Sequence, residues 1–402
     1  MKNDQNVLLN NIDDGYDAYN DFYASISVLF RIASFILLIA FLIFLVYSAI
    51  GSQEAFTYEN LEFVVRNFAL TLQENRDESV YAIKYNPDSS RNFALLGNKF
   101  ALCGNSGISV FSPTGRLTCS DSFAFKNPIM VTSDKYALVY DSENCDYVIY
   151  NSFSKVHSQS LEKPIRGASM SPNGYYAFIT SSVEYNSTVE VYNDDFELMN
   201  RFNKSGYIVD VDMDNNQVLI ATIEGASDNA LYDIQILLYD LTAGKTISTV
   251  ELTSSFPLSC KLSSSGFFLV CKDETITHDI VTDNQNRYSY KGSIISDFEL
   301  ANDKAALLLE IPGYDISFDY VVIDEHASVL YDYQVNSTVY DIEFCGDKSC
   351  LLTDGKILVY NSAIEKTILL DVASTDHRLL AYSADAIYLC TSSSAPLIRI
   401  VE

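Results

Sequence analysis

The stretch ILVYNSAIEK, residues 357–366, begins as an apolar strand, ends that strand at a Tyr-Asn pair and continues into polar residues. Near-copies recur along the chain: YVIYNSFSK from Tyr147, VEVYNDDFE from Val189, ILLYDLTAGK from Ile236 and a looser form, ISVFSPTGR, from Ile108. Self-similarity at a bounded spacing is the signature of a repeat architecture. The repeated unit therefore decides the fold.

The spacing of the repeat indicates the blades of a β-propeller. The second strands of successive units are marked by Phe100, Tyr136, Tyr175, Gln217, Phe267, Lys304, Ser349 and Ile387. Their intervals range from 36 residues (100 to 136) to 50 residues (217 to 267). One unit reads as four strands, IRGASMSP, YYAFITSS, TVEVYN and ELMNRFN, with Asn173-Gly174 at the first turn. A period of about 40 residues with four short strands is typical of propeller blades.

The fold class is predicted to be all-β, with a single propeller over residues 79–402. Eight four-stranded blades are expected, and seven is the alternative because the unit around Thr275–Asp283 is poorly patterned. The C-terminus supplies only three strands, RLLAYSA, AIYLCTSS and PLIRIVE, while SVYAIKYNP at Ser79–Pro87 has no partner. We expect residues 80–85 to pair with the C-terminal blade, because closing the ring removes free sheet edges.

An uncharged apolar segment, IASFILLIAFLIFLVYSAI, covers residues 32–50. Extended back to Ile26, it reaches the roughly 20 apolar residues that a membrane-spanning helix needs. We predict a transmembrane anchor from Ile26 to Ile50, after an acidic cytosolic tail at 1–25. Residues 51–78 follow as a connector in which ENLEFVVRNFALTLQEN has the apolar spacing of an amphipathic helix.

The basic residues beside the anchor predict its orientation. Arg31 lies at the N-terminal edge and Lys2 further out, whereas the other flank offers only Arg66 within twenty residues. Because positive charge is retained on the cytoplasmic side, we expect a single-pass cell-membrane protein with the N-terminus in the cytoplasm and an extracytoplasmic propeller. The formal net charge of −27 excludes nucleic acid as a partner, since the chain has no basic cluster to bind phosphates.

The SPNG turn at Ser171–Gly174 and the Tyr-Asn or Tyr-Asp strand endings resemble degenerate WD-repeat and TolB-type blades. The whole plan of tail, anchor, short helix and divergent propeller is similar to an uncharacterised family of Gram-positive bacterial proteins known as a domain of unknown function. The chain lacks the Gly-His and Trp-Asp pairs of WD repeats and has no aspartate box. The resemblance therefore implies a fold and a membrane location, and transfers no WD-repeat activity.

Acidic residues align on three inner strands. Residues two apart on a strand share a face, and inner strands line a propeller's channel. The aligned set consists of Asp210, Asp297 and Asp341, then Asp212, Glu299 and Glu343 two residues on, with Lys261 in the intervening unit. Their carboxylates could hold a hard cation such as calcium through oxygen ligands. Alternatively, each caps the backbone of a neighbouring strand or faces channel water.

Other reactive residues show no recognised spacing. The eight cysteines include no C-x-x-C pair, so neither a zinc site nor a redox pair is predicted. Cys345 and Cys350 flank the turn GDKS and could form either a cross-strand disulfide or two buried thiols. The histidines, His157, His278, His326 and His377, are scattered, and no nucleophile elbow or phosphate-binding loop is present. No catalytic residue or organic cofactor is predicted.

The function expected from these features is a non-catalytic binding or scaffolding module for a protein or cell-envelope partner. Contacts are expected at two long inserts, Ile223–Gln235 and Glu310–Tyr320, which mix aromatic residues with carboxylates. The alternative is an envelope polysaccharide hydrolase or lyase that uses paired carboxylates near the channel.

Overall fold

The computed structural model describes residues 27–28, 30–39, 82–86, 92–227, 231–313, 316–362, 366–372 and 378–400. The chain divides into two compact units, Met1–Phe68 and Ala69–Glu402. In the first unit, residues 27–28 and 30–39 are helical, and Arg31 is exposed. Over the described ranges, no helix combines the length and the apolar character that crossing a membrane requires. Ile26 and Ile50, the predicted ends of the anchor, and the connector at 51–78 lie outside these ranges.

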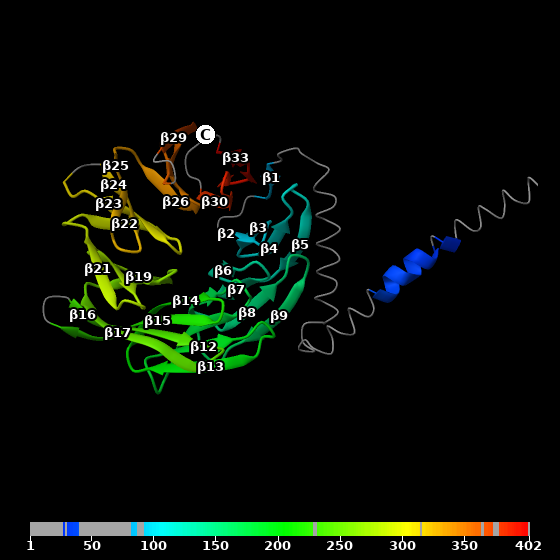
Figure 1. The fold of residues 1–402 in the computed structure, drawn as a ribbon, viewed down its shortest axis with the longest axis horizontal. Helices are drawn as coiled ribbons and strands as arrows, with labels where there is room; N and C mark the ends of the chain where they lie inside the picture. The colour runs from blue at the N-terminus through cyan, green and yellow to red at the C-terminus, as the bar shows by residue number, and fades with distance from the viewer. Residues whose placement is uncertain are drawn as a thin grey trace, which may run out of the picture. The chain divides into compact units, whose positions relative to one another are not determined.

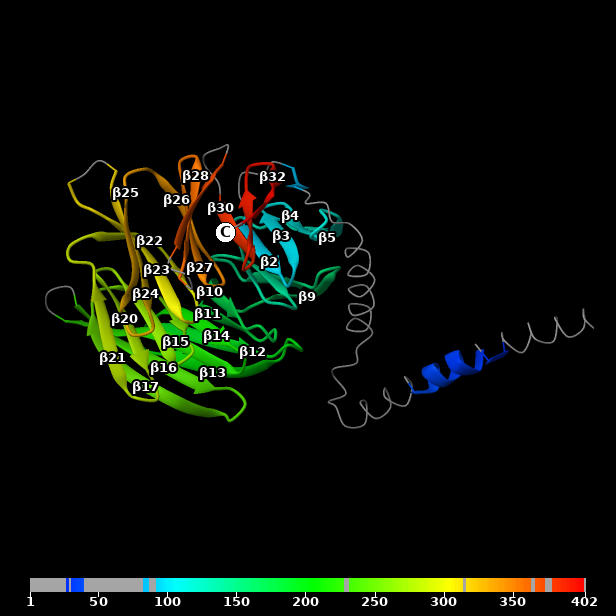
Figure 2. The same cartoon turned by 45° about the horizontal axis from the view of Figure 1, so that its top comes forward.

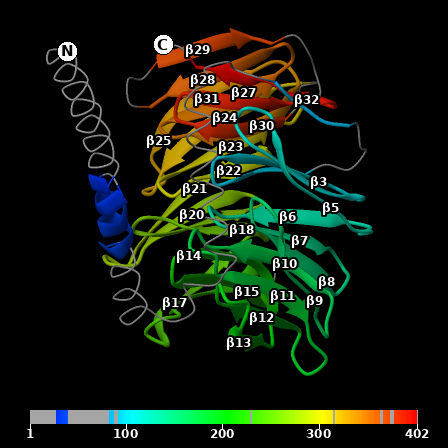
Figure 3. The same cartoon turned by 90° about the vertical axis from the view of Figure 1, so that its right-hand side faces the viewer.

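The second unit is an eight-bladed, all-β propeller, which confirms the predicted fold class. Antiparallel sheets are arranged around a ring, with the first strand of each four-stranded sheet nearest the centre (Figure 1), and Figure 3 shows the sheets from the side. Seven of them are four-stranded, and their strands pair in the order of the sequence. The unit around Thr275–Asp283, whose weak pattern left seven blades as an alternative, forms a regular third strand, Glu274–Asp279.

The first four blades are bounded as follows. Blade 1 contains β2 (Asn92–Leu96), β3 (Lys99–Gly104), β4 (Gly107–Phe111) and β5 (Leu117–Ser122). Blade 2 contains β6 (Pro128–Thr132), β7 (Ala137–Asp141), β8 (Asp146–Tyr150) and β9 (Lys155–Ser160). Blade 3 contains β10 (Ile165–Met170), β11 (Tyr176–Ser181), β12 (Ser187–Tyr192) and β13 (Leu198–Lys204). Blade 4 contains β14 (Tyr207–Asp214), β15 (Gln217–Ser227), β16 (Leu231–Asp240) and β17 (Lys245–Ser254).

The remaining blades complete the ring. Blade 5 contains β18 (Pro257–Leu262), β19 (Gly266–Cys271), β20 (Glu274–Asp279) and β21 (Asn284–Ser289). Blade 6 contains β22 (Ile294–Leu300), β23 (Lys304–Glu310), β24 (Phe318–Asp324) and β25 (Val329–Val335). Blade 7 contains β26 (Val339–Cys345), β27 (Lys348–Thr353), β28 (Lys356–Asn361) and β29 (Lys366–Asp371). Blade 8 contains β30 (Arg378–Ser383), β31 (Ala386–Cys390), β32 (Ser394–Ala395) and β33 (Leu397–Arg399), with β1 (Ile83–Lys84) beside β32.

Burial follows the position of a strand within its blade. Second strands such as β19 (GFFLVC) and β27 (KSCLLT) are buried along their whole length, because both of their faces pack against neighbouring blades. Outer strands such as β21 alternate between partly buried and exposed residues, as expected when one face meets water. The core is thus a ring of apolar layers between blades.

The recurrent Tyr-Asn pair has a structural role at the end of the third strand. The hydroxyl of Tyr150 donates to Oδ2 of Asp121 in the preceding blade at 2.9 Å, and that of Tyr360 donates to the carbonyl of Leu330 at 3.2 Å. The side-chain oxygen of Asn151 accepts the backbone N–H groups of Phe153 and Ser154, both at 2.8 Å. The aromatic residue therefore ties adjacent blades together, and the amide fixes the turn.

Strand β1 completes the last blade (Figure 2). It pairs antiparallel with β32, with Ile83 opposite Ala395, while β33 pairs with β31. The hydroxyl of Tyr85 donates to the carbonyl oxygens of Thr391 at 2.7 Å and Ser394 at 2.9 Å. The fourth strand of blade 8 thus comes from the chain segment that precedes blade 1, so the ring is closed by segments from both ends of the propeller.

Candidate functional site

The predicted channel residues occupy equivalent positions on successive inner strands. Five inner strands, β10, β14, β18, β22 and β26, have a one-residue register shift near their start. The residues that resume pairing after the shift are Gly167, Asp210, Ser259, Asp297 and Asp341. The three aspartates are therefore at one level, each paired directly after the bulge of its strand.

The carboxylates of blade 4 bind the backbone of blade 5. Oδ2 of Asp210 accepts the Ser259 hydroxyl at 2.6 Å and the Cys260 N–H at 3.0 Å. Two residues on, Oδ2 of Asp212 accepts the N–H of Leu262 at 2.8 Å. These bonds satisfy N–H groups on the edge of β18, which would otherwise face the channel unpaired.

The same arrangement recurs between blades 7 and 8. Oδ2 of Asp341 accepts the N–H of Leu379 at 2.6 Å. Asp297 accepts the N–H of its own neighbour, Phe298, at 2.9 Å. The three aspartates thus bond to three different blades, and among the residues that the structure describes no three His, Cys, Asp or Glu side chains are placed to hold a metal ion. The contacts of Asp210 and Asp341 are those of strand caps, whereas Asp297 bonds within its own strand.

Burial shifts the protonation of this ring of carboxyl groups. It raises the pKa of Asp341 to about 6, with the N–H of Leu379 and the charge of Arg378 opposing the shift. It raises the pKa of Glu299 to about 7 against the charge of Lys261. It raises the pKa of Glu343 to about 9, assisted by repulsion from Glu299. At neutral pH, Glu343 therefore carries a proton and can donate a hydrogen bond.

Part of the channel is a cavity of about 360 Å³. Residues of β6, β10, β14, β18 and β22 line it, and Asp210, Asp212, Lys261 and Glu299 are among them. One ammonium group among several carboxylates leaves an acidic, polar interior. Such a cavity suits water or a small cationic or zwitterionic molecule more than an apolar one.

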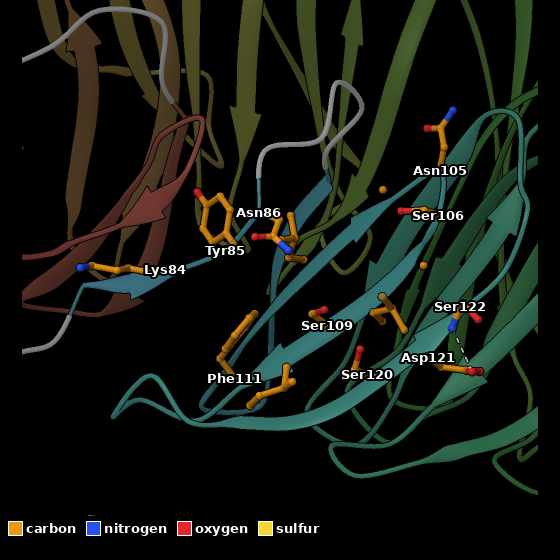
Figure 4. Close-up of a pocket in the computed structure, with 15 residues that line it drawn as sticks. Lys84, Tyr85, Asn86, Asn105, Ser106, Ser109, Phe111, Ser120, Asp121 and Ser122 are labelled. Atoms are coloured by element: carbon orange, nitrogen blue, oxygen red, sulfur yellow. Dashed lines mark hydrogen bonds between the residues drawn. The ribbon is translucent and has the colours of Figure 1, made fainter.

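A larger cleft of about 870 Å³ lies at the seam where β1 meets blade 1 (Figure 4). Strand β1 has only two residues, and the facing strands β4 and β5 carry the cross-strand pairs Ser109–Ser120 and Gly107–Ser122. The small side chains of β4 and β5, opposite a strand of only two residues, leave the volume of this cleft unfilled. This cleft was not predicted from the sequence; the serine-rich strand LTCSDS, in the blade that follows the incomplete final blade around the ring, is the signal that could have indicated it.

One carboxylate in the seam cleft is held in place by its neighbours. Asp121 accepts the Tyr150 hydroxyl at 2.9 Å, and the Lys155 ammonium lies 3.2 Å away. Partial burial opposes ionisation, but these contacts and the N–H of Ser122 hold the pKa of Asp121 below its ordinary value. Together with the Asn105, Ser106 and Ser120 side chains, it gives the cleft a wall of hydroxyl, amide and carboxylate groups that suits a polar ligand.

The two inserts differ from each other in structure. Ile223–Gln235 continues β15 and β16 past the length of the other blades, with Gly225 opposite Asp233 and Ser227 opposite Leu231. Glu310–Tyr320 contains the connection between β23 and β24, where the hydroxyl of Ser317 donates to Oδ1 of Asn336 at 3.1 Å. The first insert is therefore a projecting hairpin rather than a loop.

The cysteines are free thiols, and two of the histidines pack against aromatic rings. Cys345 and Cys350 are free, buried thiols, and a hydrogen bond between them together with burial raises the pKa of Cys350. His157 stacks on Phe196 with ring centres 4.6 Å apart, and His278 stacks on Phe267 at 5.2 Å. His377 lies outside the described residues.

Comparison with known proteins places the propeller. A family model described as "Family of unknown function (DUF5711)" matches residues 74–368. The chain belongs to this family. A search of curated proteins finds no match. Among solved structures, the chain is similar to the computationally designed Ika8 protein, with a TM-score of 0.60 and 11% identity over 79% of this chain and 98% of that one.

A second similar structure is BamB from Moraxella catarrhalis, with a TM-score of 0.54 and 12% identity. That match covers 79% of this chain and 96% of the BamB chain. At such identities the likeness concerns the fold, and it shows that a complete propeller of this size accounts for most of the DUF5711 chain.

Proposed function

We propose that this member of the DUF5711 family is a single-pass, membrane-anchored propeller, placed outside the cytoplasm, that acts as a non-catalytic binding or scaffolding module for a protein or cell-envelope partner. The proposed anchor, Ile26–Ile50, contains the uncharged segment at residues 32–50, and the positions of Lys2 and Arg31 favour a cytoplasmic N-terminus. The anchor places the protein in the membrane, and the two faces of the propeller ring indicate which of its elements could meet a partner.

The order of the strands defines those faces. The connection from the outer strand of one blade to the inner strand of the next lies at one face of the ring. Because neighbouring strands are antiparallel, the connection from the second to the third strand of each blade lies at that same face. We call this the loop face, and the opposite one the entry face. Strand β1 is an outer strand, so Ala82, just before it, lies at the entry face, whereas the β15–β16 hairpin lies at the loop face.

The observation that carries the proposal is that the channel carboxylates are engaged in bonds between blades while the loop face projects a long hairpin. Asp210, Asp212 and Asp341 cap backbone N–H groups of the next blade. These bonds make the ring a rigid support, and recognition residues are commonly carried by loops on such supports. The hairpin, at the face opposite Ala82, is the part of this support that we expect to meet a partner.

The test is crosslinking in living cells. We compare the intact protein with a variant in which residues 224–233 are replaced by an Asn-Gly turn, so that Ile223 still pairs with Ile234. A Val281→Ser variant is the control, since Val281 is exposed in the β20–β21 turn at the entry face. Loss of one crosslinked partner in the shortened variant alone supports binding through the loop face. Turnover of envelope glycans that disappears when Asp297 and Asp341 become Asn would contradict a non-catalytic role.

A further inference from the structure

A cleft of about 470 Å³ lies between blades 2 and 3, where β9 and β13 are the outer strands (Figure 1). Residues of β9 form one wall, and residues of β12 and β13 form the other. The connections that follow β9 and β11 border the cleft at the loop face, and Phe196 and Leu198 border it at the opposite end. We call this the rim cleft. Among the described residues, it shares none with the channel cavity or the seam cleft.

The register of blade 3 places its polar side chains on the face that looks toward blade 2. Tyr192 belongs to the apolar core between these two blades. Alternate residues of a strand share a face, so Glu190 and Thr188 also point toward blade 2. Arg201 lies opposite Glu190 in the β12–β13 ladder, and Asn203 lies opposite Thr188, which puts both side chains on that face.

Blade 2 supplies a glutamine to the facing wall. Gln159 lies opposite Tyr147 in the β8–β9 ladder, and its Oε1 accepts the Tyr147 hydroxyl at 3.2 Å. The same hydroxyl is 3.5 Å from the hydroxyl of Tyr176 in blade 3, so this side of β9 faces blade 3. The inner part of the interface is filled by aromatic and aliphatic side chains, whereas the outer part, where Gln159 is exposed, is polar.

Protein bonds hold the polar side chains of blade 3 in place. Oδ1 of Asn203 accepts the Thr188 hydroxyl at 3.0 Å. Oε1 of Glu190 accepts Nε and one Nη of Arg201, at 3.0 and 2.7 Å. Oε2 of Glu190 accepts the Tyr192 hydroxyl at 3.0 Å.

Gln159, Arg201 and Asn203 therefore offer fixed donors to a ligand. All three residues are exposed, and the bonds to the amide oxygens of Gln159 and Asn203 do not use their NH2 groups. The guanidinium of Arg201 likewise has N–H groups beyond the two that bond to Glu190. These donors suit a ligand that is rich in hydroxyl or carbonyl oxygens.

An aromatic ring stands at each end of the rim cleft. Tyr185, in the connection between β11 and β12, is 41% exposed and borders the loop-face end. Phe196 borders the other end, where its ring stacks on His157 with centres 4.6 Å apart. Polar groups fix the orientation of a ligand, and aromatic faces cover its apolar surface. A sugar ring fits this arrangement, because hydroxyl groups surround its edge and C–H groups form its faces.

The charges of the cleft favour a neutral ligand. The charged residues that line it are Glu162, Lys163, Glu184, Glu190 and Arg201, and the last two neutralise each other in an ion pair. With a net charge of −27 on the whole chain, an anionic ligand would be repelled. The cleft follows β12, whose six residues span about 17–20 Å, so a linear chain of sugars fits better than a single ring.

We propose that the rim cleft binds a neutral, linear oligosaccharide segment of a cell-envelope polymer. Gln159, Arg201 and Asn203 donate hydrogen bonds to its oxygens, and Tyr185 packs against one sugar face. This inference rests on the proposed binding function and names the chemical class of the envelope partner.

Titration calorimetry with defined oligosaccharides tests the recognition. The purified full-length chain, in a detergent without a sugar head group, is titrated with the neutral tetramers cellotetraose and chitotetraose and with the anionic tetragalacturonate. We expect at least one neutral tetramer to bind, and the corresponding dimer to bind more weakly because it fills less of the cleft. Tetragalacturonate should bind at least about tenfold more weakly than that tetramer.

A matched pair of double variants locates the site. Tyr185→Ala, Arg201→Ala should weaken binding of the tetramer by at least about tenfold. Tyr333→Ala, Arg287→Ala is the control and should bind as the parent does. Tyr333 is 43% exposed, and Arg287 forms an ion pair with a glutamate of the adjacent strand at 2.7 Å, as Arg201 does. Both double variants therefore lose one exposed aromatic ring and one ion pair.

Gln159→Ala provides a second test that breaks no ion pair. The Tyr147 hydroxyl keeps His157 as a partner, with Nε2 at 3.3 Å, so the melting temperature should change little. Binding of the tetramer should still weaken, because one donor of the cleft is lost.

Several results would overturn the inference. If neither neutral tetramer binds, the rim cleft is a groove filled by solvent. Tetragalacturonate that binds as tightly as the neutral tetramers would contradict a neutral ligand, and equal loss in both double variants, at unchanged melting temperatures, would remove the site. Absence of saccharide binding together with a crosslinked partner that depends on the β15–β16 hairpin contradicts this inference and retains the proposed function; absence of both contradicts both.

Discussion

The protonated glutamate of the channel sets a pH dependence for stability at the scale of single residues. Burial raises the pKa of Glu343 from 4.5 to about 9 in the folded protein. The folded state therefore holds a proton that the unfolded chain releases between these values, so the contribution of Glu343 is complete below about pH 4.5 and is lost as pH rises through about 9. The stability of the parent should decline over this range.

Glu343→Gln should remove that decline, because an uncharged amide mimics the protonated carboxyl. We expect a gain of about 2 kcal/mol in unfolding free energy at pH 8 and little change at pH 5, measured by urea denaturation at both values. Glu197→Gln, on an exposed turn, is the control and should change neither. A gain of the same size at both pH values would show that Glu343 is not protonated in the folded state.

Asp210 should stabilise the ring through the backbone bond between blades 4 and 5. Asp210→Ala leaves the Cys260 N–H and the Ser259 hydroxyl without their acceptor, at a cost of about 2 kcal/mol in unfolding free energy. Asp210→Asn retains an acceptor oxygen and should cost less. Asp195→Ala, at an exposed position, serves as control. If Asp210→Ala unfolds with the same free energy as the parent, removal of a buried charge offsets the loss of the bonds that Asp210 accepts.

The calcium hypothesis for Asp210, Asp297 and Asp341 stays a prediction with a direct measurement. A cation that binds the folded protein alone must raise its melting temperature. Calcium should therefore raise the melting temperature of the parent and have no effect after all three residues are changed to Asn. A parent that is indifferent to calcium leaves strand capping as their role.

At the scale of elements, the sequence predicted the strands because the information is local. The apolar runs, the turns and the Tyr-Asn endings each lie within a few residues, and Tyr150 with Asn151 shows how one pair ends a strand and fixes its turn. The individual partners of the carboxylates could not be predicted, because Asp210 bonds to a residue 50 positions away, in the next blade. At Ile223–Gln235 the sequence predicted a long insert, and the structure shows that β15 and β16 stay paired through it, past a bulge between Ile223 and Gly225.

The pairing of β1 with the last blade can be weakened by removing a single hydroxyl group. Tyr85→Phe removes the hydroxyl that donates to the carbonyls of Thr391 and Ser394. Because these bonds hold β1 to the last blade, we expect a loss of about 1–2 kcal/mol in unfolding free energy, seen as a lower melting temperature. Tyr333→Phe, at a ring 43% exposed on β25, is the control. Equal effects of the two changes would show that the closing bonds contribute nothing specific.

For the whole molecule, the period of the repeat predicted the number of blades, and the count of strands at the C-terminus indicated where a fourth strand was missing. The cleft at the seam was not predicted, because its volume depends on which small residues of β4 and β5 face a strand as short as β1. The sequence repeat predicts the order of the blades along the chain. The packing between neighbouring blades depends on which side chains meet, which the repeat does not specify.

The orientation of the whole molecule can be determined by protease access. Lys2 and Arg31 favour a cytoplasmic N-terminus, so we expect a propeller after residue 50 to lie outside. A specific protease site is inserted at the β20–β21 turn, where Val281 is 89% exposed, because a folded propeller resists general proteases. Protease added to intact cells or protoplasts should cut this site and spare the residues before Arg31, while lysis exposes both segments. Protection of the inserted site in intact protoplasts, with cleavage after lysis, would place the propeller in the cytoplasm and direct the search for its partner there.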